Sequence, residues 1–74
     1  MNKTIKIQGY KERVFEAIRR SGLSVSEVAR RMNGRRQVFY SDHQMHLGNL
    51  AKFCSVTGCS ADYILGLSRE VKRK

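Results

Sequence analysis

The chain has 74 residues, with 15 lysines and arginines against six aspartates and glutamates, and its formal charge is +9. This length supports one domain and leaves little room for a deep active-site cleft between two lobes. Apolar residues make up 41%, which is enough for a small core, and no apolar run approaches the roughly 20 residues of a membrane span.

The first third of the chain predicts an arm followed by a helix. Residues 1–9 alternate polar and apolar side chains over four positions, which fits either a short strand or a loose N-terminal arm. Residues 10–21 have the period of an amphipathic helix, with Val14 and Ile18 on its apolar face. Gly22 is typical of the left-handed residue that ends a helix.

A second helix is predicted after Ser24. This serine opens a capping box with Glu27, in which the serine oxygen accepts from the third amide and the glutamate reaches back. The apolar stripe of the helix consists of Val25, Val28, Ala29 and Met32. Asn33 and Gly34 both tolerate a positive φ, so the chain is expected to turn there.

The segment after this turn is ambiguous from local preferences. Residues 35–42 hold β-branched and aromatic side chains that favour a strand, yet as a helix they would bury Val38 or Phe39. The remaining side chains would then be exposed: Arg35, Arg36, Gln37, Tyr40 and Ser41. Residues 42–46 are expected to form a loop.

Two more helices and a tail complete the prediction. A fourth helical stripe is formed by Leu47, Leu50, Ala51, Phe53, Cys54 and Thr57, and Gly58 follows it. Ser60 is a suitable N-cap for a last helix, which would turn Ile64 and Leu65 inward and end at Gly66. Residues 68–74 form a basic C-terminal tail that could bind phosphate, fold back or stay disordered. The expected fold is therefore all-α, with five short helices.

The excess positive charge is concentrated in one short stretch, residues 19–36, and in the C-terminal tail. Residues 19–36 contain six arginines and one acidic residue, Glu27. A concentrated basic stretch is typical of a protein that binds a polyanion, although such a stretch can also be a solvated face. Arginine, unlike lysine, forms bidentate hydrogen bonds with phosphates and with guanine edges, which favours the first interpretation.

The second helix, the Asn33-Gly34 turn and the following segment have the order of a helix-turn-helix, whose second helix fits the major groove of DNA. Residues 22–32, GLSVSEVARRM, resemble the opening of phage-repressor and Cro-like (lambda-repressor-like) regulators. Residues 50–66, LAKFCSVTGCSADYILG, are similar to the last two helices of that family almost position by position. The resemblance covers residues 10–67, and having both motifs in the right order makes it more specific than either alone.

This resemblance implies a five-helix domain over 10–67 that binds specific double-stranded DNA, usually as a homodimer. The segment after the turn would be the recognition helix, with Arg36, Gln37, Tyr40 and Ser41 facing the bases. Ser24 and Arg35 would lie near phosphates. Val25 stands where the family commonly has a phosphate-binding glutamine, so Ser26 would replace that contact. The short connection between Phe39 and Leu47 implies a short or shifted recognition helix.

The sequence gives little support for a metal site or for an enzyme. The spacing of His43, His46, Cys54 and Cys59 matches no common zinc site, and no set of residues resembles a catalytic arrangement. We therefore expect no metal, no cofactor, no small-molecule substrate and no enzymatic activity. The first ten residues lack the apolar stretch of a signal peptide, so we expect a cytoplasmic protein whose cysteines are reduced and buried.

Two regulatory roles fit the resemblance. The first is a repressor or Cro-like transcriptional regulator of a phage or mobile element. The alternative is the DNA-binding antitoxin of a toxin–antitoxin pair, which would also need a surface for the toxin. An RNA-binding module is less consistent with the sequence, because no cluster of aromatic residues is available for base stacking.

Overall fold

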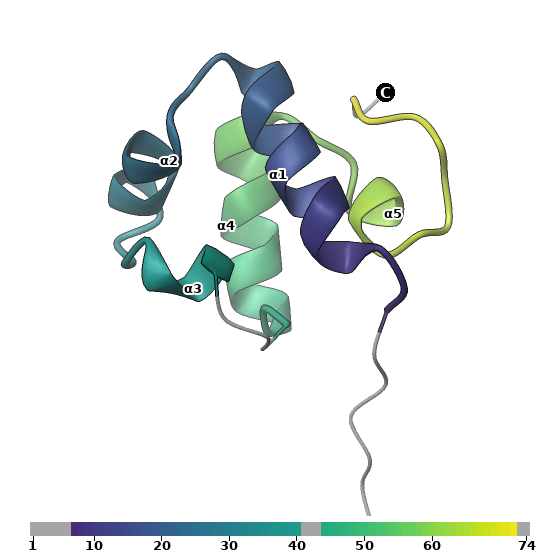
Figure 1. The fold of residues 1–74 in the computed structure, drawn as a ribbon, viewed down its shortest axis with the longest axis horizontal. Helices are drawn as coiled ribbons and strands as arrows, with labels where there is room; N and C mark the ends of the chain where they lie inside the picture. Colours follow the sequence, from purple (N-terminus) through teal and green to yellow (C-terminus); the bar gives the residue numbers. More distant parts are fainter. Residues whose placement is uncertain (1–6, 41–43, 73–74) are drawn as a thin grey trace, which may run out of the picture.

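The computed structural model describes residues 7–40 and 44–72, and this part of the chain is mostly helical (Figure 1). Its five helices are α1 (Tyr10–Ser21), α2 (Val25–Arg31), α3 (Gln37–Tyr40), α4 (Leu47–Thr57) and α5 (Ala61–Ile64). Within the described ranges the only β pairing is an isolated antiparallel bridge between Cys59 and Lys72. The all-α prediction is confirmed for these residues. The possible N-terminal strand over 1–9 lies mostly outside them.

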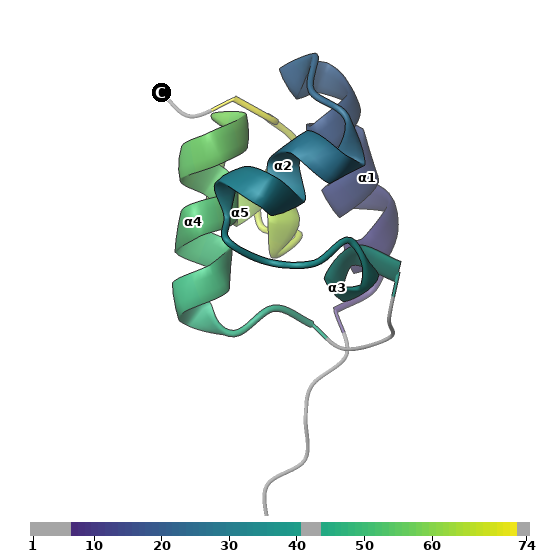
Figure 2. The same ribbon diagram turned by 90° about the vertical axis from the view of Figure 1, so that its left-hand side faces the viewer.

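The helices pack around α1 and α4. Helix α1 contacts α3, α4 and α5, and α4 also contacts α2 and α5. Helices α2 and α3 lie at one end of the molecule and α5 lies at the other (Figure 1). Viewed from that end, α2 and α3 are both at the front, and the connection between them is exposed (Figure 2).

The core comes from the predicted helical stripes. Helix α1 buries Val14, Ala17 and Ile18, and α2 buries Val28 and Ala29, as expected. The largest side chains with almost no exposure are Phe53 and Ile64. Phe53 also packs against Phe39 of α3, with ring centroids 5.8 Å apart. One core therefore joins all five described helices.

The predicted stripe of α4 is only partly correct. Leu50, Phe53 and Cys54 are buried, but Leu47 is 82% exposed and Ala51 is exposed too. At roughly 100° per residue, Leu47 and Ala51 fall on the same flank of the helix, away from the centre of its buried face. The predicted apolar stripe is therefore wider than the face of α4 that α1, α2 and α5 cover.

The predicted caps are confirmed at one helix and corrected at another. Ser24 Oγ accepts a hydrogen bond from the Glu27 N–H at 3.1 Å, which caps α2. The Glu27 carboxylate instead bonds to arginines one turn further on, so only half of the predicted capping box forms. Ser60 makes no side-chain cap, and its N–H donates to Val71 O at 2.6 Å.

The turn after α2 depends on Asn33, which has a φ of 57°, whereas Gly34 has no positive φ. The Asn33 N–H donates to Arg30 O at 3.1 Å and the Gly34 N–H to Ala29 O at 2.9 Å. These two bonds are the pair that defines a Schellman motif, with Asn33 as its left-handed residue. A turn was predicted at this position, but the residue that needs the unusual conformation is the asparagine.

The C-terminal segment folds back over the domain. Besides the Ser60–Val71 hydrogen bond and the bridge at Cys59, the side chain of Val71 packs against the core. Of the three states left open for the predicted tail, the described residues through Lys72 therefore adopt the folded-back one. Cys54 and Cys59 are both buried, as expected, and form no disulfide within the described residues; their sulfur atoms lie 3.7 Å apart.

Candidate nucleic-acid interface

The described residues among those expected to contact DNA lie at the end of the molecule formed by α2, the Asn33 turn and α3 (Figure 2). Ser24 and Ser26 are exposed at the start of α2. Arg35, Arg36 and Gln37 are exposed where the chain enters α3. Ser41, the last of the predicted base contacts, lies outside the described residues.

Four of the six arginines between 19 and 36 are paired with carboxylates. On α1, Glu16 Oε2 accepts from Arg19 Nη2 at 2.5 Å and from Arg20 Nε at 2.7 Å. On α2, Glu27 accepts in the same way from Arg30 and from Arg31, whose Nε lies 2.7 Å from Oε2. Each cluster holds one negative and two positive charges, so its net charge is smaller than the arginine count suggests.

The neighbouring arginines strongly lower the pKa of both glutamates. Hydrogen bonds from Arg19 and Arg20 lower the pKa of Glu16 to about 2, and bonds from Arg30 and Arg31 do the same to the pKa of Glu27. Both carboxylates are therefore ionised throughout the physiological pH range. Sequence reasoning missed these clusters, although a glutamate followed by arginines at i+3 and i+4 is the spacing that brings such side chains together.

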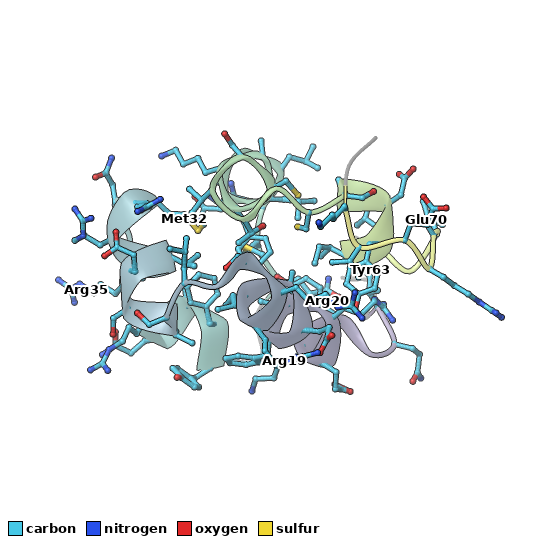
Figure 3. The ribbon with its side chains drawn as sticks, turned by 90° about the horizontal axis from the view of Figure 1, so that it is seen from above. Arg19, Arg20, Met32, Arg35, Tyr63 and Glu70 are labelled. Carbon is cyan, nitrogen blue, oxygen red and sulfur yellow. The ribbon has the colours of Figure 1, made fainter. Side chains whose placement is uncertain are left out.

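The remaining two arginines, Arg35 and Arg36, are not paired with a carboxylate of the described residues. The side chains of Arg35 and Arg36 are exposed and form no ion pair or hydrogen bond with the part of the chain that the structure describes. Figure 3 shows Arg35 extending away from the fold, far from Arg19 and Arg20 on α1. Among the described residues, the arginine charge of this stretch that has no carboxylate partner is thus located at the entrance to α3.

Helix α3 is short, which is one of the two alternatives expected for the segment after the turn. It spans four residues, and Arg35 and Arg36 precede it rather than lie on it. The helix buries Phe39 and half-buries Val38, so the exposed set predicted for the helical alternative is confirmed where it is described. Residues that contact bases from this end would therefore lie in the α2–α3 connection and at the first residue of α3.

Tyr40, which was expected to face the bases, also contacts helix α1 within the fold. Its side chain is 56% exposed, but its ring packs on Phe15 of α1 with centroids 5.4 Å apart. Its carbonyl oxygen accepts a hydrogen bond from Lys11 Nζ at 2.8 Å. Helix α1 therefore holds the C-terminal end of α3 in place.

The chain that enters α4 is also held by α1 and the residues before it. Tyr10 Oη accepts from the Met45 N–H at 2.9 Å, and the Ile7 N–H donates to Gln44 Oε1 at 2.7 Å. Burial raises the pKa of Tyr10, and the hydrogen bond from Met45 partly opposes this rise. Residues 7–11 thus fix both flanks of the α3–α4 connection through contacts more than 25 positions apart in sequence, which local patterns cannot predict.

Among residues 7–40 and 44–72 no cluster of three or more histidine, cysteine or acidic side chains could hold a metal ion. His46 is the N-cap of α4, where Nδ1 accepts from the Asn49 N–H at 3.3 Å. His43 lies outside the described residues. No helix in the described part is both long and apolar enough to cross a membrane.

Comparisons of the chain with protein-family models, with curated proteins and with solved structures find no match.

Proposed function

We propose that this chain is a sequence-specific double-stranded DNA-binding regulator that contacts DNA with the α2–α3 end. The observation that carries the proposal is the run Arg35, Arg36 and Gln37, which is exposed and, for the two arginines, unpaired within the described residues. Guanidinium and amide side chains are the groups that form bidentate hydrogen bonds with guanine and adenine edges in the major groove. The resemblance of residues 22–32 and 50–66 to Cro-like regulators points to the same end of the molecule.

In this proposal the contacts divide into two kinds. Arg36 donates two hydrogen bonds to guanine O6 and N7, and Gln37 pairs with adenine N6 and N7. Ser24, Ser26 and Arg35 bind phosphates, which fixes the register of the protein on the duplex without reading its sequence. Since α3 has only four residues, we expect each subunit to read a short half-site, and a homodimer to supply the rest of the specificity.

The proposal is tested by selecting bound duplexes from a random DNA library at near-physiological salt. Electrostatic binding without sequence preference is expected of any protein with this charge, so enrichment is the informative result. An inverted repeat with half-sites about one helical turn apart supports a dimeric regulator, and a single half-site supports a monomer. Selection without any enriched sequence contradicts the proposal.

On an enriched duplex, Arg36→Ala is expected to weaken binding by about 1–3 kcal/mol and to relax the preference at one base pair, because it removes one bidentate contact. Arg19→Ala is the charge-matched control, since Arg19 is paired with Glu16 on α1. Fluorescence anisotropy with single-base variants of the duplex measures both effects. An equal loss of affinity on every duplex would make Arg36 a phosphate contact instead of a base contact.

A further inference from the structure

A hollow of about 220 Å3 lies between the C-terminal end of α2, α3 and α4, beside the proposed DNA-reading residues. Its polar lining consists of Asn33 and Arg35 from the α2–α3 connection and Asn49 and Lys52 from α4. Its apolar lining includes Met32, Val38 and Phe39. The hollow thus brings α4 into contact with the same surface as Arg35, although α4 is outside the helix-turn-helix segment.

The polar groups of the hollow favour an anion. Arg35 and Lys52 carry like charges, and no acidic side chain lines the hollow. None of the four polar side chains forms a hydrogen bond or ion pair with other described residues. Arg35 and Lys52 both line the hollow, so an anion bound in it would be attracted by two positive charges. The two amides add hydrogen-bond donors for its oxygen atoms.

The size and the floor of the hollow favour a unit of a polymer over a free metabolite. Small-molecule sites usually enclose roughly 300–1,000 Å3, which is more than this hollow offers. A bare inorganic anion would leave the apolar floor uncovered. One sugar–phosphate unit has both parts, namely an anionic phosphodiester for the cations and a carbon-rich sugar face for Val38 and Met32.

We propose that this hollow binds one sugar–phosphate unit of the DNA backbone, held by Arg35 and Lys52 together. This inference rests on the proposed function, and it adds Lys52, Asn33 and Asn49 to the DNA contacts. Phosphates line the edge of the groove whose bases Arg36 and Gln37 would read, so a phosphate contact by the directly preceding residue is consistent with those base contacts. Lys52 anchors the backbone and carries no sequence preference.

The first test measures duplex affinity against salt concentration for the full chain, for Lys52→Gln and for the control Arg69→Gln. Arg69 is exposed and lies beyond α5, and its substitution removes the same charge as Lys52→Gln. Equal thermal midpoints verify that the three proteins fold alike. Loss of one phosphate contact lowers the slope of log K against log salt by about 1 and weakens binding uniformly across sequences. We expect this result for Lys52→Gln and an unchanged slope for Arg69→Gln. Equal slopes for the two variants would overturn the inference.

The second test does not require duplex binding. The side-chain amide signals of Asn33 and Asn49 are followed by NMR during titration with a thymidine dinucleotide, which has one phosphodiester, and separately with inorganic phosphate and benzoate. The dinucleotide is expected to move both signals in the natural chain and not in Lys52→Gln. If the dinucleotide moves both signals but the chain binds no duplex, the proposed function is contradicted, while the sugar–phosphate site in the hollow is supported. Shifts caused only by phosphate or benzoate would assign the hollow to a free anion and overturn the inference, as would no shift with any probe.

Discussion

At the scale of single residues, two neighbours in the α2–α3 connection, Asn33 and Gly34, differ in the sign of their backbone φ. Asn33 adopts a positive φ and completes the Schellman motif, whereas Gly34 has an ordinary φ. A Cβ atom added at Gly34 would meet only Ala29 O, at 4.0 Å. The sequence offered both residues for the positive φ of this turn, and the structure assigns that conformation to the asparagine alone.

This difference predicts unequal effects of substitution at the two positions. Asn33→Val forces a β-branched side chain into the left-handed region and is expected to destabilise the fold by roughly 1–2 kcal/mol. Gly34→Ala serves as the control and is expected to change stability little, because both its φ and its surroundings accept a methyl group. Chemical denaturation of the two variants measures the difference. A larger loss for Gly34→Ala would contradict this account of the turn.

At the scale of the helices, α1 and α2 each carry a glutamate that binds two arginines on the next turn. The pKa of each glutamate is lowered from an ordinary value of 4.5 to about 2. A lowered pKa means that the carboxylate form stabilises the folded state. This stabilisation is fully present above the unfolded pKa near 4.5 and is lost as the pH falls through the folded pKa near 2.

The variant Glu16→Gln/Glu27→Gln is therefore expected to lose less stability than the natural chain between pH 6 and pH 2. Glu12→Gln is the control on the same helix, since Glu12 is exposed and forms no ion pair with the described residues. Thermal unfolding followed by circular dichroism at each pH measures the change. Identical pH dependence in the double variant and the natural chain would show that the two clusters do not stabilise the fold.

Helix α3 is an element that depends on its neighbours. A four-residue helix cannot be stable alone, because one turn fixes several dihedral angles for few hydrogen bonds. It is instead held by Phe39 in the core, by the Phe15–Tyr40 ring contact and by the bond from Lys11. This explains why the propensity of residues 35–42 did not decide between strand and helix. The decision comes from contacts with α1 and α4.

At the scale of the whole molecule, the long helices were predictable and the connections were not. The apolar spacing and the glycines after Ser21 and Thr57 predicted the bounds of α1 and α4, because these signals are local. The hydrogen bond between Tyr10 and Met45 and the return of Val71 to Ser60 join distant segments, and no local pattern contains them. For the candidate site, exposure was predicted correctly for the residues that the structure describes, but the pairing of Arg19, Arg20, Arg30 and Arg31 with glutamates was not considered.

The folded-back C-terminal segment is expected to protect Cys59. Cys59 is 2% exposed and forms an isolated bridge with Lys72. A chain that ends at Ser68 lacks Val71 and Lys72, so its Cys59 is expected to react faster with a thiol reagent. Mass spectrometry of labelled peptides distinguishes Cys59 from Cys54, and the truncated Cys59→Ser chain is the control. An unchanged labelling rate would show that the segment does not cover the thiol.

The hydrogen bond from Gly34 to Ala29 also has a consequence for the chemical ageing of the protein. Asparagine is thermolabile, because the backbone nitrogen of a following glycine can attack its side-chain carbonyl and expel ammonia. Water then opens the resulting cyclic imide to a carboxylate, so the net change is the loss of ammonia and the gain of water. In the folded chain that nitrogen donates to Ala29 O at 2.9 Å, which withdraws it from the attack. We expect Asn33 to persist in the native protein and to deamidate when the chain is unfolded at neutral pH, a gain of one mass unit. The product places a new carboxylate among Arg30, Arg31, Arg35 and Arg36, so unfolding damage would weaken polyanion binding even after refolding.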